Sequence, residues 1–155
     1  MKKELEIFID GASSGNPGEA AVGVVINCDN KRIKDISQTI GQATNNVAEY
    51  RALLCALEEA LKLEAKALKI FTDSELLFSQ VTGRYKVKNE QLKVLFDQAQ
   101  ELAKKFEDVK IDHIPREKNY EADRLATQAL KKQAKMVTST SIGFKPMTRS
   151  TPPPI

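Results

Sequence analysis

Two patterns of apolar and polar residues follow one another along this chain, and their order predicts a mixed α/β domain. Short apolar runs bounded by turn-forming residues predict strands at 5–10, 20–28, 31–40, 67–72 and 109–114. Apolar residues spaced three or four positions apart predict helices at 45–63, 74–82, 90–106 and 119–134. Residues 11–18 are expected to form a loop, and Asp29-Asn30 the turn of a hairpin between the second and third strands.

The order of these elements also predicts how the sheet is connected. The first strands are joined by a hairpin, and the later strands alternate with helices. This order indicates a mixed sheet in which an antiparallel hairpin lies beside parallel strands. Right-handed crossovers favour a five-stranded mixed sheet of order 3-2-1-4-5, with helices on both faces. The first and fourth strands would then be parallel neighbours at the point where sheet growth reverses, which is where open α/β sheets bind ligands.

Four acidic residues are placed near this point. Asp10 and Asp73 are predicted to be the last residues of the first and fourth strands, in two similar apolar segments. Glu49 and Asp123 fall in the opening turns of predicted helices, near the stripe that faces the sheet. Each acid alone could simply cap a strand end or face a helix dipole. Together they would repel one another in a buried crevice, so we expect them to surround divalent cations.

The segments around these acids resemble type 1 ribonucleases H. The resemblance covers about residues 4–130, and its matching stretches are Asp10-Gly11 with Gly15-Asn16-Pro17-Gly18, Thr44-Asn45-Asn46-Val47-Ala48-Glu49, Thr72-Asp73-Ser74 and Asn119-Tyr120-Glu121-Ala122-Asp123. It implies the ribonuclease H-like fold and an endonuclease that hydrolyses the RNA strand of RNA–DNA hybrids. It also implies that Asp10, Glu49, Asp73 and Asp123 are the catalytic and metal-binding residues.

The chemistry of carboxylates agrees with that implication. Magnesium prefers hard oxygen ligands, and a pair of ions can activate water and stabilise a leaving oxygen. We therefore expect two Mg²⁺ ions as cofactor, with Mn²⁺ able to substitute, and products with 5′-phosphate and 3′-hydroxyl ends.

The resemblance further implies a set of substrate-binding residues. Four of them would line the minor groove of the hybrid: Ser13, Asn16, Asn45 and Asn46. Thr44 and Asn89 match family positions that contact a phosphate of the DNA strand. Helix capping and turn formation are ordinary alternative roles for such polar residues.

Three departures from better-known members of that family limit the comparison. The loop 115–118 has no histidine, so Arg116 is the candidate to hold a phosphate there, and His113 is expected to be structural. The connection 83–88 is too short for the basic helical protrusion that some relatives use to bind hybrid. A separate N-terminal hybrid-binding domain is also not expected.

Composition is that of an ordinary soluble protein, with 41% hydrophobic and 29% charged residues in 155. No apolar run approaches the roughly 20 residues that span a bilayer. The start of the chain does not resemble a signal peptide, and Cys28 and Cys55 lack metal-site spacing. We expect the protein to be a cytoplasmic monomer that binds RNA–DNA hybrids and does not bind a membrane.

Charge divides the chain into two parts. Residues 131–155 contain five basic residues and no acid, so of the net charge of +3 the first 130 residues contribute −2. We expect a catalytic domain at residues 1–135 and a basic Ser/Thr/Pro-containing tail at 136–155, irregular beyond Val137. The tail is either a solubilising segment or a tether for a polyanion.

Two other functions are consistent with the residues. One is a different nuclease on the same architecture: an exonuclease, a junction resolvase or an enzyme that also cuts double-stranded RNA. The first strand lacks the aspartate–glutamate pair of an exonuclease. The other is a non-catalytic hybrid-binding module, which the loss of any of the four acids would favour; all four are present.

Overall fold

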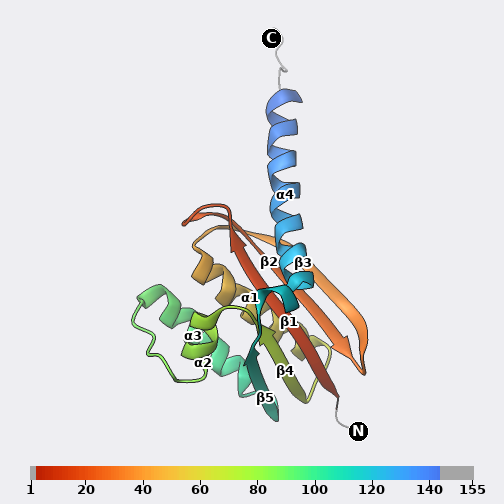
Figure 1. Cartoon of the computed structure of the whole chain (residues 1–155), viewed down its shortest axis with the longest axis vertical. Coiled ribbons are helices and arrows are strands. Elements are labelled where there is room, and N and C mark those ends of the chain that lie inside the picture. Colours follow the sequence, from red (N-terminus) through yellow and green to blue (C-terminus); the bar gives the residue numbers. More distant parts are fainter. Residues whose placement is uncertain (1–2, 144–155) are drawn as a thin grey trace.

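A five-stranded sheet with helices on both faces forms the domain (Figure 1), in a computed structural model that describes residues 3–143. Its strands are β1 (Glu4–Ser13), β2 (Gly18–Cys28), β3 (Lys31–Ala43), β4 (Ala67–Thr72) and β5 (Asp108–His113). Its helices are α1 (Asn45–Lys62), α2 (Glu75–Val81), α3 (Glu90–Ala103) and α4 (Tyr120–Gly143), with a 3-10 turn, η1 (Arg116–Lys118). The strand order β3-β2-β1-β4-β5 confirms the predicted topology.

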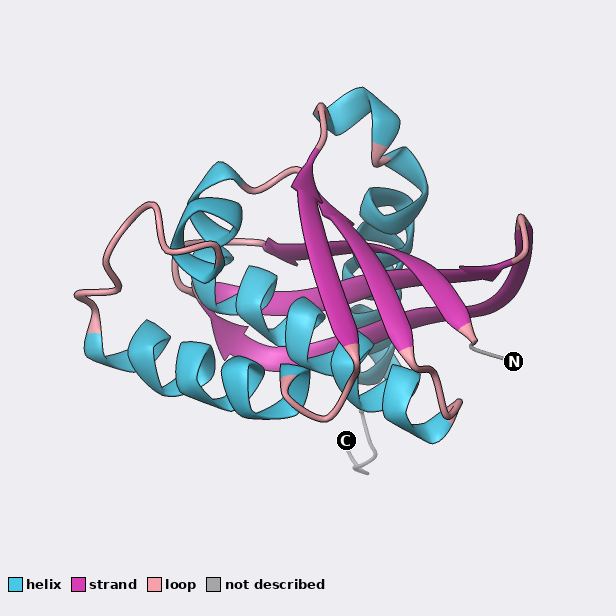
Figure 2. Cartoon of the chain, turned by 90° about the horizontal axis from the view of Figure 1, so that it is seen from below, coloured by secondary structure: helices cyan, strands magenta, loops and turns pink. Residues whose placement is uncertain are grey.

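The helices divide between the two faces of the sheet. Helix α1 packs on β1 and β2 and is itself covered by α3, while α4 packs on β1, β2 and β3. Figure 2 shows the strands lying between these helical layers. The core on the α1 side is built from the alternating apolar residues of the central strands, such as Leu5, Ile7 and Ile9, which are 0% exposed. This alternation places every second residue of β1 in the core.

The prediction for the end of β1 was wrong. Asp10 is not the last residue of its strand, because the expected loop residues 11–13 continue the antiparallel ladder with β2 as far as Ser13. The parallel ladder between β1 and β4, however, ends at the pair Ile9–Thr72. Asp10 is therefore the first residue of β1 beyond its parallel neighbour, and Asp73 is the first residue after β4. Both acids thus lie at the reversal point of the sheet.

Helix α4 is longer than the sequence predicted. It continues to Gly143, past the expected end near Ala134 and through the first part of the segment predicted to be an irregular tail. Residues 134–142 contain no glycine or proline, so nothing stops the helix before Gly143. The rest of the predicted tail lies outside the described residues. Smaller differences are that β3 extends to Ala43 and α3 already ends at Ala103.

Among residues 3–143, no helix combines the length and the apolar character needed to cross a membrane.

A glycine in β2 lets α4 approach the sheet. A Cβ atom on Gly23 would lie 2.0 Å from the carbonyl oxygen of Ala122 and 2.8 Å from the backbone nitrogen of Ala126. Gly23 is paired directly with Asp10 across the β1–β2 ladder, so the close approach occurs beside that acid. Because Gly23 has no side chain, the first turns of α4 can lie next to Asp10.

Replacing Gly23 tests this packing. Gly23→Ala is expected to lower the free energy of unfolding by about 1–3 kcal/mol, the usual cost of overpacking, because backbone atoms cannot rotate away as a flexible side chain would. Urea unfolding of the variant and the wild type measures the difference. A variant as stable as the wild type would mean that α4 is not held this tightly against β2.

Candidate active site

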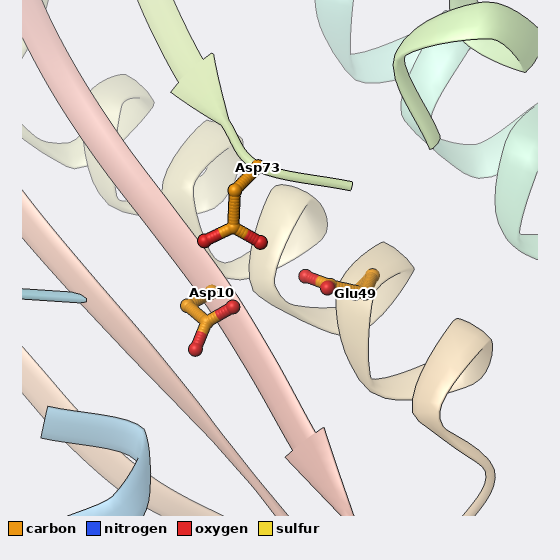
Figure 3. A group of neighbouring side chains, drawn as sticks. All are labelled: Asp10, Glu49 and Asp73. Atoms are coloured by element: carbon orange, nitrogen blue, oxygen red, sulfur yellow. The ribbon is translucent and has the colours of Figure 1, made fainter. Parts of the chain in front are cut away.

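Three carboxylates from separate elements meet at the reversal point of the sheet (Figure 3). Asp10 comes from β1, Glu49 from the first turns of α1, and Asp73 from the segment after β4. Each offers one oxygen, and these oxygens all lie within 4.8 Å of one another. The structure therefore brings together three of the four acids that the sequence singled out.

Gly11 fixes Glu49 against β1. The backbone N–H of Gly11 donates a hydrogen bond to Oε1 of Glu49 at 2.9 Å. A Cβ atom on Gly11 would lie 2.2 Å from the carbonyl carbon and oxygen of Ala48, so only glycine lets α1 come this close. The glycine after Asp10 serves close approach rather than flexibility, and it sets the distance between Asp10 and Glu49.

Asp123 lies beside this group but does not join the three within that distance. It is in the first turn of α4, and a side-chain hydrogen bond with it contributes to raising the pKa of Asp10. On its other side, Oδ1 of Asp123 lies 3.6 Å from the Arg116 guanidinium, which is highly exposed. Asp10 is thus the shared neighbour of Asp123 and of the Glu49–Asp73 pair.

Burial and mutual repulsion disfavour the charged forms of two of these acids. Burial, followed by the charges of Glu49 and Asp73, raises the pKa of Asp10 to about 9. Burial also raises the pKa of Glu49 to about 8, against the lowering effect of the Gly11 N–H and of Arg116. Without a compensating cation, the charged forms of Asp10 and Glu49 are therefore disfavoured.

The donor atoms fit a hard divalent metal ion. The three clustered ligand atoms are all carboxylate oxygens, the type that Mg²⁺ and Mn²⁺ prefer, and no cysteine or histidine belongs to the cluster. A divalent cation would also remove the repulsion that raises the two pKa values. The residues present therefore suit the expected metal centre.

Asn119 is a neighbour of the site to which the sequence pattern assigned no role. It is 1% exposed, and its Nδ2 donates to the carbonyl oxygen of Ile9 and to Oδ2 of Asp73. Its position in the family-like segment 119–123 was the available signal, but an asparagine before a helix is usually read as a cap.

Hydrogen bonds join three of the residues predicted to contact the minor groove, at the end of β1, in the β1–β2 turn and at the start of α1. Asn45 Oδ1 accepts a hydrogen bond from the Ser13 backbone at 2.9 Å, and Asn16 Oδ1 accepts one from the Asn45 backbone at 3.1 Å. Ser13 Oγ also donates to the Ala43 carbonyl at 2.8 Å. These bonds attach the end of β1 and the turn after it to the end of β3 and the start of α1. Their substrate role stays a prediction, as does that of the exposed Asn46.

The residues predicted to contact a DNA phosphate have capping roles in the structure. Thr44 caps α1 by accepting from the Val47 N–H at 3.2 Å, and Asn89 caps α3 by accepting from the Leu92 N–H at 2.9 Å. Capping uses their side-chain oxygens, so it explains their presence without a substrate. Contact with phosphate remains a prediction for both.

His113 ends β5 close to the site. Its Nε2 lies 3.3 Å from the Asp73 carbonyl oxygen, and its ring lies 6.0 Å from that of Phe78. These contacts with the backbone and with α2 agree with the structural role that the sequence predicted.

Known proteins share this fold and this sequence pattern. Residues 8–129 match a family described as reverse transcriptase-like. The crystal structure of RNase H1 from the halophilic archaeon Halobacterium salinarum is 41% identical, with a TM-score of 0.82 over 83% of this chain and 98% of that one. An RNase H1 isolated from compost, crystallised in complex with an RNA/DNA hybrid, is 38% identical, with a TM-score of 0.79 over 84% of this chain and 99% of that one.

A third relative is the N-terminal RNase H domain of a bifunctional Mycobacterium tuberculosis protein. It is 43% identical, with a TM-score of 0.78 over 81% of this chain and 98% of that domain. This chain spans 35% of the full-length mycobacterial protein and 64% of the full-length Halobacterium ribonuclease HI.

The raised pKa values predict how the stability of the metal-free protein depends on pH. In the folded protein, Asp10 and Glu49 retain protons that the same residues release near pH 4 in the unfolded chain. Their protonated forms therefore contribute fully to the free energy of unfolding below about pH 4. This contribution is lost as the pH rises through about 8–9. Asp10→Asn removes the most perturbed group and should melt no lower than the wild type at about pH 8. Mg²⁺ should raise the melting temperature of the wild type, because it binds only the folded cluster.

Thermal unfolding of both proteins between about pH 5 and about pH 9, with Mg²⁺ or with chelator, measures these effects. An Asp10→Asn variant that melts clearly below the metal-free wild type at the upper end of this range would contradict the repulsion between the carboxylates.

Proposed function

This chain belongs to the ribonuclease HI family, and from that premise we propose that it hydrolyses the RNA strand of RNA–DNA hybrids. The observation that carries the proposal is the meeting of Asp10, Glu49 and Asp73 within 4.8 Å, with Asp123 beside Asp10. A relative with 38% identity has been crystallised with an RNA/DNA hybrid, which supports this class of substrate.

The acids are proposed to hold two divalent cations. When bound, such ions activate a water molecule and stabilise the leaving 3′-oxygen, which would give 5′-phosphate and 3′-hydroxyl ends. Asp10 neighbours all three other acids and is therefore the residue placed to serve both ions. We assign Glu49 and Asp73 mainly to one ion and Asp123 to the other. Mg²⁺ is the expected metal, and Mn²⁺ shares its preference for oxygen ligands.

The chain's own residues would select and orient the hybrid. Ser13 is the last residue of the strand that carries Asp10, and Asn45 is the first residue of the helix that carries Glu49. Hydrogen bonds join both residues and Asn16, so the three can present rigid polar groups to a 2′-hydroxyl. Arg116 keeps an exposed guanidinium next to Asp123, where it can hold a phosphate of the RNA strand. It cannot replace a histidine in proton transfer, because guanidinium does not lose its proton at neutral pH.

Cleavage of uniformly labelled hybrid tests this function. The wild type should cut the RNA strand with Mg²⁺ or Mn²⁺ and not with chelator. Asp10→Asn should lower the rate by more than about 100-fold, beyond the loss typical of residues that only support a ligand. Asp97→Asn is the matched control, because this exposed aspartate on α3 pairs only with Lys93 among the ion pairs of the described residues.

Equal rates for Asp10→Asn and the wild type would reject the metal assignment. Duplex RNA and duplex DNA belong in the same assay, since preferential cutting of duplex RNA would favour the alternative nuclease. Binding of hybrid without any cleavage would favour the non-catalytic module.

The basic tail is proposed to add affinity for the hybrid, because the chain has no long basic insertion at 83–88. Deleting residues 136–155 removes Lys145 and Arg149 and should weaken hybrid binding. The slope of log affinity against log salt should fall by up to about 1.8, or about 0.9 for each phosphate that the protein no longer neutralises.

Replacing only Lys145 and Arg149 by glutamine is the matched control, since it keeps the length of the chain and removes the charge. The tether idea fails if affinity and salt slope are unchanged by the deletion. It also fails if the deletion weakens binding while the glutamine variant does not.

A further inference from the structure

Asn119 connects β1 to the segment after β4 through one amide group. It lies between η1 and α4, and its Nδ2 is 2.8 Å from the carbonyl oxygen of Ile9 and 3.0 Å from Oδ2 of Asp73. Both partners are hydrogen-bond acceptors, so both N–H bonds of the amide are used. A flipped amide would place its oxygen against two other oxygens, which fixes the orientation of the group.

The same residue also holds the backbone beside Asp10 on β1 and at Asp123 on α4. Ile9 immediately precedes Asp10 on β1, so the bond to its carbonyl holds the backbone beside that acid. The backbone N–H of Asp123 donates to the carbonyl oxygen of Asn119 at 3.1 Å, in the first turn of α4. Asn119 therefore binds Asp73 at its carboxylate, Asp123 at its backbone, and Asp10 through the residue that precedes it.

Asn119 does not act as an ordinary helix cap. A cap uses its side-chain oxygen to accept a hydrogen bond from the first turn of the helix. Among the described residues, Oδ1 of Asn119 is the one buried side-chain nitrogen or oxygen atom without a hydrogen-bond partner. A buried acceptor without a partner is rare and needs a reason. The reason available here is that the nitrogen side of the amide must face Ile9 and Asp73.

We propose that Asn119 is a positioning residue of the metal centre, which holds the Asp73 carboxylate toward Asp10 and sets the distance from α4 to β1. This inference rests on the proposed function, since it assigns Asn119 to the residues that would support the ion ligands. Asn119 acts through Asp73, in the way that groups hydrogen-bonded to metal ligands orient those ligands. Without the bond from Asn119, the Asp73 carboxylate could turn away from the repelling Asp10.

Metal affinity measured without nucleic acid tests the inference. Mn²⁺ binding to the 155-residue chain is followed by calorimetry for the wild type and Asn119→Ala. The variant should bind Mn²⁺ about 10–100-fold more weakly, the loss typical of residues that support a ligand. In cleavage assays its activity should require a higher Mg²⁺ concentration, while its KM for the hybrid at saturating metal stays that of the wild type.

Ser37→Ala is the matched control. Ser37 Oγ donates to the Leu125 carbonyl at 2.6 Å, so it also ties α4 to the sheet, and this bond involves none of the acids. Its loss should leave Mn²⁺ affinity unchanged. If Ser37→Ala weakens Mn²⁺ binding as much as Asn119→Ala does, the effect is a general loosening of α4 and the inference is overturned.

A folded Asn119→Ala variant with wild-type Mn²⁺ affinity and wild-type metal dependence would also overturn it. Should that variant not fold, Asn119→Ser replaces it, because a hydroxyl has one donor and can satisfy only one of the two acceptors. The same weakening is then expected, and its absence decides against the inference. A wild type that binds Mn²⁺ but does not cut hybrid would reject the proposed function, while the comparison of affinities would still decide the role of Asn119.

Discussion

Repulsion between closely spaced carboxylates is the constraint on which this site depends. Asp10, Glu49 and Asp73 are held within 4.8 Å of one another, and burial together with their mutual charge raises the pKa of two of them far above the usual range. A fold that tolerates such a cluster must hold it by other interactions, because the acids themselves push apart. A divalent cation bound between the carboxylates would relieve the same repulsion.

The interactions that hold the cluster are backbone contacts made possible by small residues. Gly11 lets α1 approach β1, and its N–H binds Glu49. Gly23 lets α4 approach the opposite face, directly across the ladder from Asp10. Because β4 stops one residue short of Asp10, Asp73 and the side chain of Asn119 have room at the end of the parallel ladder. Rigid elements therefore carry the acids, which suits a site that must keep its geometry with or without metal.

The predictions from the sequence were limited to features that a linear pattern of residues can encode. The strand order followed from handedness and element order, and the structure confirms it. The end of β1 was misplaced because residues 11–13 have turn-like composition, yet pairing with β2 keeps them extended. The end of α4 was misplaced because serine and threonine were read as a loop signal, although no helix-breaking residue occurs before Gly143. Thr44 and Asn89 cap helices in the structure, and the sequence pattern cannot distinguish this role from the predicted phosphate contact, because the same polar side chains suit both.

The sequence by itself determined the family and singled out four acids, three of which the structure brings together, because these acids stand in short segments whose composition is set by local structure. It also determined the topology, since crossover handedness is a property of every L-amino-acid chain. Only the tertiary structure decided why Gly11 and Gly23 are glycines, where Asp123 stands relative to the other three acids, and that Asn119 binds Asp73. These facts join residues far apart in the sequence, such as Gly23 with Ala122 and Asn119 with Asp73. Such contacts exist only after packing has brought the helices and strands together, so no periodicity along the chain can report them.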